Sequence, residues 1–274
     1  MTTQDLNKSH PLAFFVLVFA LSTPFWIISV NSVHSFLPDD IPVTDIGATL
    51  SPFIAACALI YMENGTAGLK RFLARILDYD RIKNKRWLVI AIFLLPCLYA
   101  VTYAAMRIAA LPVPHYLTIS TSLLGALAMF TVAATVEEIG YSAYATDALQ
   151  SKHSALETSL IIGVPWALWH LPSMIKMSQT SQLIAWGLVA TLAFRVITVW
   201  IYNNSNFSLF AVVIAHAVGT TTRTAFPGGR HGYELGEGSI SYFIIILTAI
   251  IVTTLWGWRS LSNFRGSRSL DADN

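Results

Sequence analysis

Long apolar blocks separated by short polar segments run along most of the chain. A helix needs about 20 mainly apolar residues to cross the hydrocarbon core of a bilayer. Blocks of roughly that length cover residues 12–30, 46–62, 87–106, 123–150, 156–174, 182–202, 207–222 and 239–258. Tryptophan and tyrosine residues lie at several block ends, as is typical of the membrane interface. The pattern predicts an all-α polytopic membrane protein with about eight transmembrane helices.

Basic residues are concentrated in two of the polar segments. The segment 70–86 and the tail after residue 258 carry Lys and Arg, whereas Asp39 and Asp40 lie in a segment without either. Because Lys and Arg accumulate on the cytoplasmic side, we expect both basic segments and both termini to be cytoplasmic. The segment 65–79 is predicted to be an amphipathic helix on the inner surface, or else a solvated loop. The segment 222–238 would be an external loop.

The composition supports a membrane location. The 274 residues are 55% hydrophobic and 12% charged, too few polar residues to cover a water-soluble globule. A net charge of +2 gives no reason to expect nucleic-acid binding. Cys57 and Cys97 lie in apolar blocks and are expected to be buried small hydrophobes. We expect one membrane domain over residues 1–264, a disordered cytoplasmic tail over 265–274, and location in a bacterial inner membrane.

Five ionisable residues fall inside the predicted spans. They are Glu137 and Glu138 in the fourth span, His170 in the fifth, Arg195 in the sixth and His216 in the seventh. Such residues cost several kcal/mol at membrane depth unless they are paired or line a cavity, so they mark candidate functional sites. Arg195 lies near enough to the cytoplasmic end of its span to extend its charge to the interface. Alternatively, it supplies a positive charge to the glutamates.

Helix rise places three of these residues at a similar depth. Glu137, His170 and His216 each lie about 10 to 14 residues from the cytoplasmic ends of their predicted spans, or roughly 15 to 20 Å at 1.5 Å per residue. We therefore predict one polar site shared by the fourth, fifth and seventh spans. Neighbouring residues on a helix point about 100° apart, so only one of Glu137 and Glu138 can face the centre of that site.

These residue types suit two kinds of chemistry. Glutamate and histidine are ordinary zinc ligands, and Glu137, His170 and His216 would be the ligands of a bound zinc ion. Without a metal, a buried carboxylate can act as a general base toward water. Two adjacent carboxylates repel each other, which makes Glu137 or Glu138 a proton acceptor near neutral pH unless a cation lies beside it.

The order of these motifs resembles the CPBP family of intramembrane proteases, which includes the Ras-converting CAAX endopeptidase and bacterial immunity and abortive infection proteins. Glu137 and Glu138 match the carboxylates of a Glu-Glu-x-x-x-Arg motif. Trp166 and His170 match an aromatic residue about one turn before a histidine, and His216 matches the start of His-x-x-x-Asn/Asp. The resemblance is close over residues 137–220, within a core that covers about residues 120–222. The resemblance implies that Glu137 activates a water for attack on a peptide bond, assisted by His170 and His216, with or without zinc.

Two positions depart from the family pattern. Ser142 replaces the arginine of the first motif, and Thr220 replaces the asparagine or aspartate of the third. Ser142 stands at i+4 from Glu138, where the arginine would neutralise that carboxylate and serine offers only a hydrogen bond. Thr220 has a shorter reach than an amide and cannot replace a carboxylate ligand.

Three functions follow from these observations. The first is an intramembrane endopeptidase that cleaves a membrane-embedded or lipidated peptide near the cytoplasmic side. The second is a family member with weakened or lost catalysis that binds a peptide or partner protein, which the residues at positions 142 and 220 would permit. The third is a proton-coupled transporter that uses the Glu and His groups as a relay, although the chain lacks the repeated halves typical of carriers.

Overall fold

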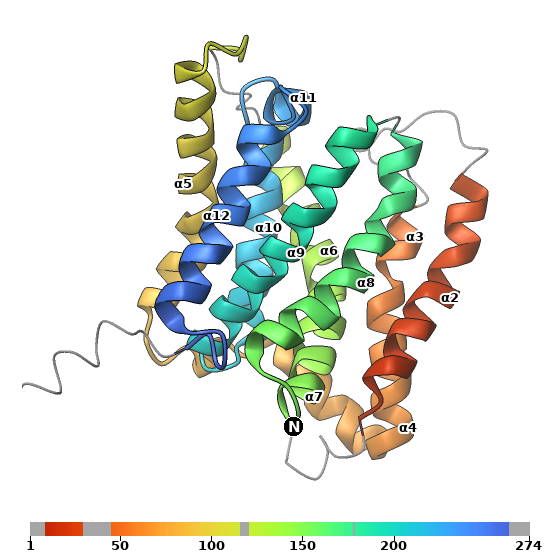
Figure 1. The fold of residues 1–274 in the computed structure, drawn as a ribbon. Coiled ribbons are helices and arrows are strands. Elements are labelled where there is room, and N and C mark those ends of the chain that lie inside the picture. Colours follow the sequence, from red (N-terminus) through yellow and green to blue (C-terminus); the bar gives the residue numbers. More distant parts are fainter. Residues whose placement is uncertain (1–8, 30–44, 116–120, 178, 263–274) are drawn as a thin grey trace, which may run out of the picture.

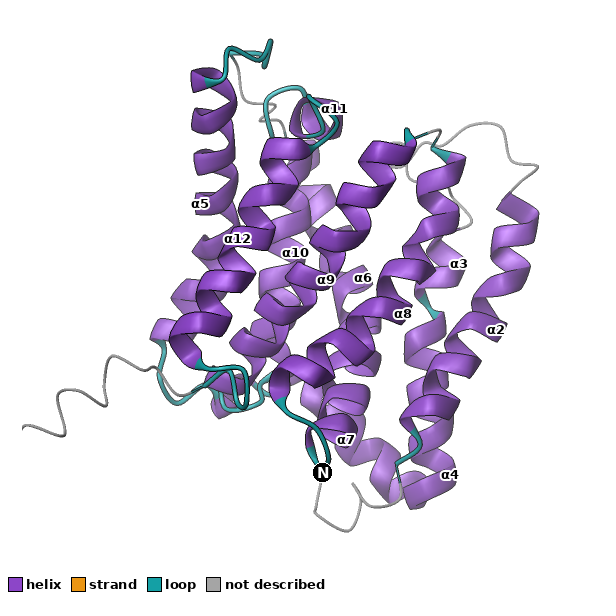
Figure 2. Ribbon diagram, viewed as in Figure 1, coloured by secondary structure: helices purple, strands orange, loops and turns teal. Residues whose placement is uncertain are grey.

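The computed structural model describes residues 9–29, 45–115, 121–177 and 179–262, and within these ranges it contains helices and no strands (Figure 2). The helices are α2 (Pro11–Ser29), α3 (Asp45–Thr49), α4 (Ser51–Leu73), α5 (Arg86–Ile108), α6 (Ser122–Glu138), α7 (Asp147–Gln150), α8 (Ala155–Lys176), α9 (Ser181–Asn204), α10 (Leu209–Thr224), α11 (Gly229–Tyr233) and α12 (Ser239–Trp256). Short 3₁₀ turns η2 (Ala74–Leu77) and η3 (Tyr79–Arg81) follow α4, and a π-helix, η4 (Ile139–Thr146), links α6 to α7.

The long helices stand side by side in one bundle (Figure 1). Among the described residues, seven helical segments are long and apolar enough to cross a membrane. The remaining predicted span corresponds to α10, which has 16 residues and packs against α5, α6 and α9. The chain is therefore an all-α polytopic membrane protein, as predicted, with a short helix among its inner elements.

The first predicted basic segment and the helix end that precedes the second lie at the same end of the bundle. The start of α2, the α4–α5 connection and the end of α12 are all at that end, while α11 lies at the opposite end (Figure 1). This arrangement agrees with the predicted even number of crossings. The assignment of that end to the cytoplasm stays a prediction, and the segment with Asp39 and Asp40 and the tail 265–274 lie outside the described residues.

The amphipathic segment after the second span is helical. Gly65 has φ +62°, a conformation that glycine adopts without steric penalty, and this residue separates the span from the helical continuation. Phe72 is buried, and Leu69 and Ile76 pack against the core. Leu77 is exposed, so the apolar face of this segment ends at Ile76.

The two cysteines are free, and one differs from expectation. Cys57 is half-buried, whereas Cys97 is exposed. The prediction of a buried Cys97 was wrong because α5 is an outer helix and other apolar side chains on it, such as Val89 and Phe93, also face outward. Apolar residues on the outside of a membrane bundle contact lipid and need no protein neighbour.

A buried polar cluster fixes the π-helix after Glu138. The Arg75 guanidinium donates to the Ala143 carbonyl at 3.0 Å and to the Asp147 carboxylate at 2.6 Å, and it also bonds Tyr202. These bonds join the amphipathic segment to η4 and α9. The widened helix therefore has a fixed position directly beside the two glutamates.

Candidate active site

The two adjacent glutamates have different surroundings. Glu137, at the end of α6, lines a partly open cavity, and its Oε2 accepts a hydrogen bond from Trp166 Nε1 at 3.2 Å. Glu138 is fully buried and lies behind Glu137, between α9 and α10. The predicted division between a residue that faces the centre and one that supports it is thus present, and Glu137 is the one that faces the cavity.

Arg195 pairs with Glu138. Its Nη1 lies 2.8 Å from Glu138 Oε2 and its Nη2 lies 3.3 Å from Oε1, with both side chains fully buried. The expectation that Arg195 extends to the cytoplasmic interface was wrong, because its α9 face points into the bundle. The alternative, that it supplies positive charge to the glutamates, agrees with these distances.

Ser142 completes the same cluster from the π-helix. Its hydroxyl donates to Glu138 Oε2 at 2.6 Å, as its i+4 position predicted, and lies 3.4 Å from Arg195 Nη1. Arg195 also lies over the Trp166 ring, 4.2 Å from its centroid, a cation–π contact. One arginine therefore contacts both Glu138 and the indole that binds Glu137.

His216, on α10, contacts the other oxygen of Glu138. Its Nδ1 lies 2.9 Å from Glu138 Oε1. A carboxylate paired with arginine is an acceptor, so Nδ1 is assigned as the donor and Nε2 stays available to the cavity. Thr220, one turn later, donates its hydroxyl proton to the His216 backbone carbonyl at 3.1 Å.

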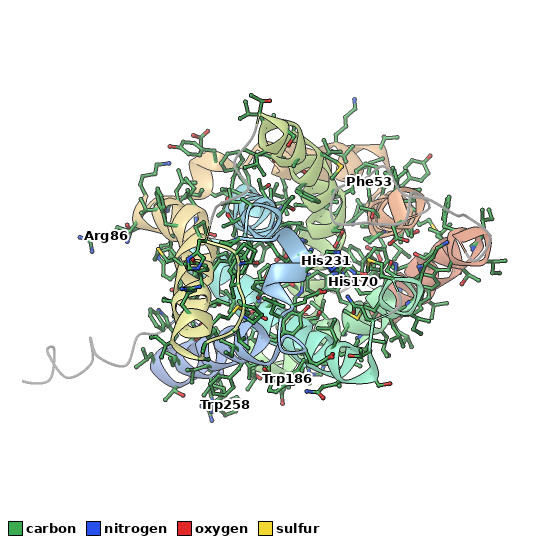
Figure 3. The ribbon with its side chains drawn as sticks, turned by 90° about the horizontal axis from the view of Figure 1, so that it is seen from above. Phe53, Arg86, His170, Trp186, His231 and Trp258 are labelled. Carbon is green, nitrogen blue, oxygen red and sulfur yellow. The ribbon has the colours of Figure 1, made fainter. Side chains whose placement is uncertain are left out.

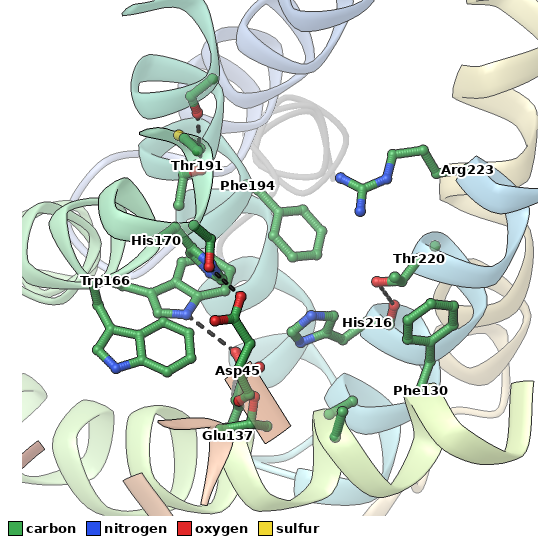
Figure 4. Close-up of a pocket in the computed structure, with 18 of the residues that line it drawn as sticks. Asp45, Phe130, Glu137, Trp166, His170, Thr191, Phe194, His216, Thr220 and Arg223 are labelled. Atoms are coloured by element: carbon green, nitrogen blue, oxygen red, sulfur yellow. Dashed lines mark hydrogen bonds between the residues drawn. The ribbon is translucent and has the colours of Figure 1, made fainter. Parts of the chain in front are cut away.

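His170 reaches the same cavity from α8. Its ring packs edge-on against Trp166 and Trp169, with centroid separations of 5.2 and 4.8 Å. Glu137, His170 and His216 line one space, as their predicted depths suggested (Figure 4). Seen along the bundle, His170 lies in the interior, whereas Arg86 and Trp258 point outward (Figure 3).

The cavity has a volume of about 600 Å³. It extends from Glu137 toward the α11 end of the bundle, where Met177, Arg223 and Tyr233 line it. Most of its walls are apolar or aromatic. Sequence reasoning missed Asp45, which bonds Ser173 in the wall, and Arg223. The only available signal for Arg223 was its spacing of seven residues from His216, on the same helix face.

The three residues predicted to bind zinc are not gathered as a metal site in this arrangement, and their role as ligands stays a prediction. Among the described residues, no group of three or more His, Cys, Asp or Glu side chains is placed to hold a metal ion. Glu138 and His216 Nδ1 are bonded to each other, and one oxygen of Glu137 is bonded to Trp166. We therefore derive no step through a metal.

Comparison with known proteins points to one family. Residues 118–222 match the model of the type II CAAX prenyl endopeptidase Rce1-like family. The chain is also 26% identical over 226 residues to CAAX prenyl protease 2 of Methanococcus maripaludis, covering 76% of this chain and 82% of that protein. The matched segment contains both glutamates, both histidines, Trp166 and Arg195. The chain is thus a membrane protein similar in sequence to the Rce1-like type II CAAX prenyl endopeptidases, as its motifs indicated.

Proposed function

We propose that this protein hydrolyses a peptide bond near the C-terminus of a membrane-associated, prenylated CAAX-type protein, using a water activated by Glu137. The family match and the relative's name support the substrate class. A CAAX sequence is a C-terminal motif whose cysteine carries the prenyl group. The observation that carries the mechanism is that Glu137 faces an apolar cavity while Glu138 behind it is ion-paired.

The reaction needs a base, an attacking water and donors for the developing oxyanion. Glu137 takes a proton from the water, whose oxygen forms a bond to the scissile carbonyl carbon. His216, protonated on both ring nitrogens, donates through Nε2 to the negative oxygen, and the His170 ring lines the same space and donates through its own N–H. The C–N bond then breaks, and Glu137 returns its proton to the leaving amine.

Glu138 and Arg195 act through other residues. Arg195 balances the charge of Glu138, so Glu137 does not lie beside an unpaired carboxylate. Glu138 orients the His216 ring through Nδ1, and Trp166 orients Glu137. We propose the metal-free form of the reaction, because among the described residues no three His, Cys, Asp or Glu side chains are gathered closely enough to hold one ion.

The second candidate is a binding protein without proteolytic activity. Thr220 favours it, because its hydroxyl proton is donated to the helix backbone and its side chain offers no amide to the cavity. The ion pair between Arg195 and Glu138 favours catalysis, since the charge missing at Ser142 is supplied from α9. Catalysis is therefore the stronger proposal.

Purified protein in liposomes tests the two candidates. The substrate is a prenylated peptide that ends in a CAAX sequence, and mass spectrometry identifies the products. We expect Glu137→Gln to reduce kcat at least 100-fold, the range for loss of a general base. Glu157→Gln is the matched control, because Glu157 forms a capping box in which glutamine is equally suitable. Unaltered peptide with the wild-type protein, or equal cleavage by Glu137→Gln, would overturn the proposal.

A further inference from the structure

The surface segment, residues 65–86, runs from the kink in α4 to the start of α5 and presents positive charge at one end of the bundle. Arg81 lies 3.8 Å from the Asp78 carboxylate, which is itself only 7% exposed. The remaining basic residues of the segment are all exposed, and they are Lys70, Arg71, Lys83, Lys85 and Arg86. Asp80 is the one exposed acidic residue in the segment. Its outer surface is therefore strongly basic.

The surface segment is held close to the membrane by the spans on both sides of it. Only residues 78–85 separate the two candidate spans, and Figure 1 shows this part of the chain crossing the end of the bundle toward α5. Leu77 and Tyr79 are 79% and 40% exposed, and the Lys85 ammonium lies 3.6 Å from the centre of the Tyr79 ring. Exposed apolar and aromatic side chains among basic ones are typical of the membrane interface.

Anionic phospholipid headgroups are the partner that this surface fits. Basic residues next to a spanning helix are attracted to a negatively charged bilayer surface, and the attraction falls off within about 10 Å at 0.1 M salt. Because both ends of the surface segment continue into spans, its basic side chains stay within reach of the headgroups. An acidic protein or a nucleic acid would have to be recruited from solution, whereas the lipid phosphate is already beside the segment.

The buried face of the same segment contacts the elements that carry the candidate active site. The Arg75 guanidinium donates to the Ala143 carbonyl of η4 at 3.0 Å. The Asp78 carboxylate accepts hydrogen bonds from the first two backbone N–H groups of α10 at 3.1 and 3.0 Å. The π-helix η4 follows directly after Glu138, and α10 carries His216. The position of the surface segment is therefore linked to the positions of both elements.

We infer that the surface segment binds anionic phospholipid headgroups through its exposed basic side chains, and that this binding stabilises η4 and α10 in their positions. A ligand that binds only the folded arrangement raises its stability, so anionic lipid should stabilise the protein. The inferred lipid site lies outside the cavity, and it does not depend on peptide hydrolysis.

Thermal unfolding of the detergent-solubilised protein with added phospholipid tests the lipid site. We expect phosphatidylglycerol to raise the unfolding midpoint by at least about 4 °C, and phosphatidylcholine with the same acyl chains by less than about 1 °C. Lys70→Gln/Arg71→Gln should lose at least half of this rise. Lys152→Gln/Arg259→Gln is the matched control, because it also removes one exposed lysine and one exposed arginine, after α7 and α12 at the same end, and it should keep the rise.

Inorganic phosphate distinguishes a lipid headgroup from a free anion. At the same concentration it should leave the midpoint unchanged, because it has no acyl chains to hold it at the segment. An equal rise with phosphatidylcholine or with phosphate would overturn the lipid site. A full rise in Lys70→Gln/Arg71→Gln, or an equal loss in the control variant, would overturn its assignment to the surface segment.

Hydrogen exchange in nanodiscs tests the link to the candidate active site. We expect the backbone amides of residues 139–146 to exchange about 10-fold more slowly in phosphatidylglycerol than in phosphatidylcholine, and this difference should shrink in Lys70→Gln/Arg71→Gln. Equal exchange in the two lipids would overturn the link between the surface segment and η4. Neither measurement needs a substrate, so its result is independent of the proposed function.

Discussion

Arg195 and Glu138 form an ion pair across α9 and the end of α6, with 2.8 Å between Nη1 and Oε2 and no solvent exposure of either side chain. The related motif carries its arginine one turn after the second glutamate, where this chain has Ser142. Here the positive charge comes from a different helix and reaches the same carboxylate. The charge requirement of the site is thus met by a residue outside the motif.

Removal of the Arg195 charge should destabilise the protein strongly. Arg195→Met leaves Glu138 buried without a cation, which costs about 3 to 5 kcal/mol when one partner of a buried pair is lost. Thermal unfolding in detergent measures the change. Ser142→Arg combined with Arg195→Met restores a cation at the motif position and should recover most of the stability and activity. If the double variant is no more stable and no more active than Arg195→Met, an arginine at position 142 does not replace Arg195, and the prediction is wrong.

The two glutamates should respond differently to the same substitution. Glu137→Gln removes a cavity-facing carboxylate and should abolish turnover with a change in unfolding free energy below about 1 kcal/mol. Glu138→Gln leaves Arg195 without its anion and should cost about 3 kcal/mol or more. Parallel unfolding and activity measurements compare them. Equal destabilisation by both variants would show that the assignment of Glu137 to the cavity and of Glu138 to the buried ion pair is wrong.

The Trp166 indole should contribute to activity through its hydrogen bond to Glu137. Trp166→Phe keeps an aromatic ring under Arg195 but removes the Nε1 donor, 3.2 Å from Glu137 Oε2. Loss of one such bond corresponds to about 1 kcal/mol, so we expect kcat/KM to fall about 3- to 10-fold with the fold retained. Trp186→Phe, outside the pocket lining, is the control. An unchanged kcat/KM in Trp166→Phe would remove the proposed positioning role.

Close helix packing at Gly140 should be sensitive to a single methyl group. A Cβ at Gly140 would lie 2.7 Å from the Pro52 backbone oxygen and 3.0 Å from a Phe14 ring atom. Gly140→Ala should therefore cost about 1 to 3 kcal/mol and lower activity, because the residue lies two positions after Glu138. Gly125→Ala meets no atom within 4 Å and should be neutral or slightly stabilising. Thermal unfolding of the two variants tests this contrast.

The predicted orientation can be measured with single cysteines. In a background with Cys57 and Cys97 replaced by alanine, Lys83→Cys reports on the basic end and His231→Cys on the α11 end. A membrane-impermeant maleimide should label His231→Cys in intact cells and Lys83→Cys only after the membrane is opened. The reverse labelling would place the basic end outside and the α11 end, toward which the cavity extends, in the cytoplasm.

The sequence by itself determined the class of the protein and the identity of most site residues. Apolar block length is set by bilayer thickness, so the helical spans followed from counting. Charged groups in lipid are costly, so Glu137, Glu138, His170 and His216 were identifiable as one site. Residue spacing within a helix also predicted the bond between Ser142 and Glu138.

Only the tertiary structure decided how these residues divide their contacts. Helix rotation determines which of two adjacent glutamates faces the cavity, and rotation depends on packing between helices. The partner of Arg195 lies 57 positions earlier in the chain, and no local pattern records which face of α9 meets α6. Arg223 likewise became a cavity residue only when α10 was packed against α5, α6 and α9. Helix periodicity gives the face on which a side chain lies but not which helix lies opposite that face.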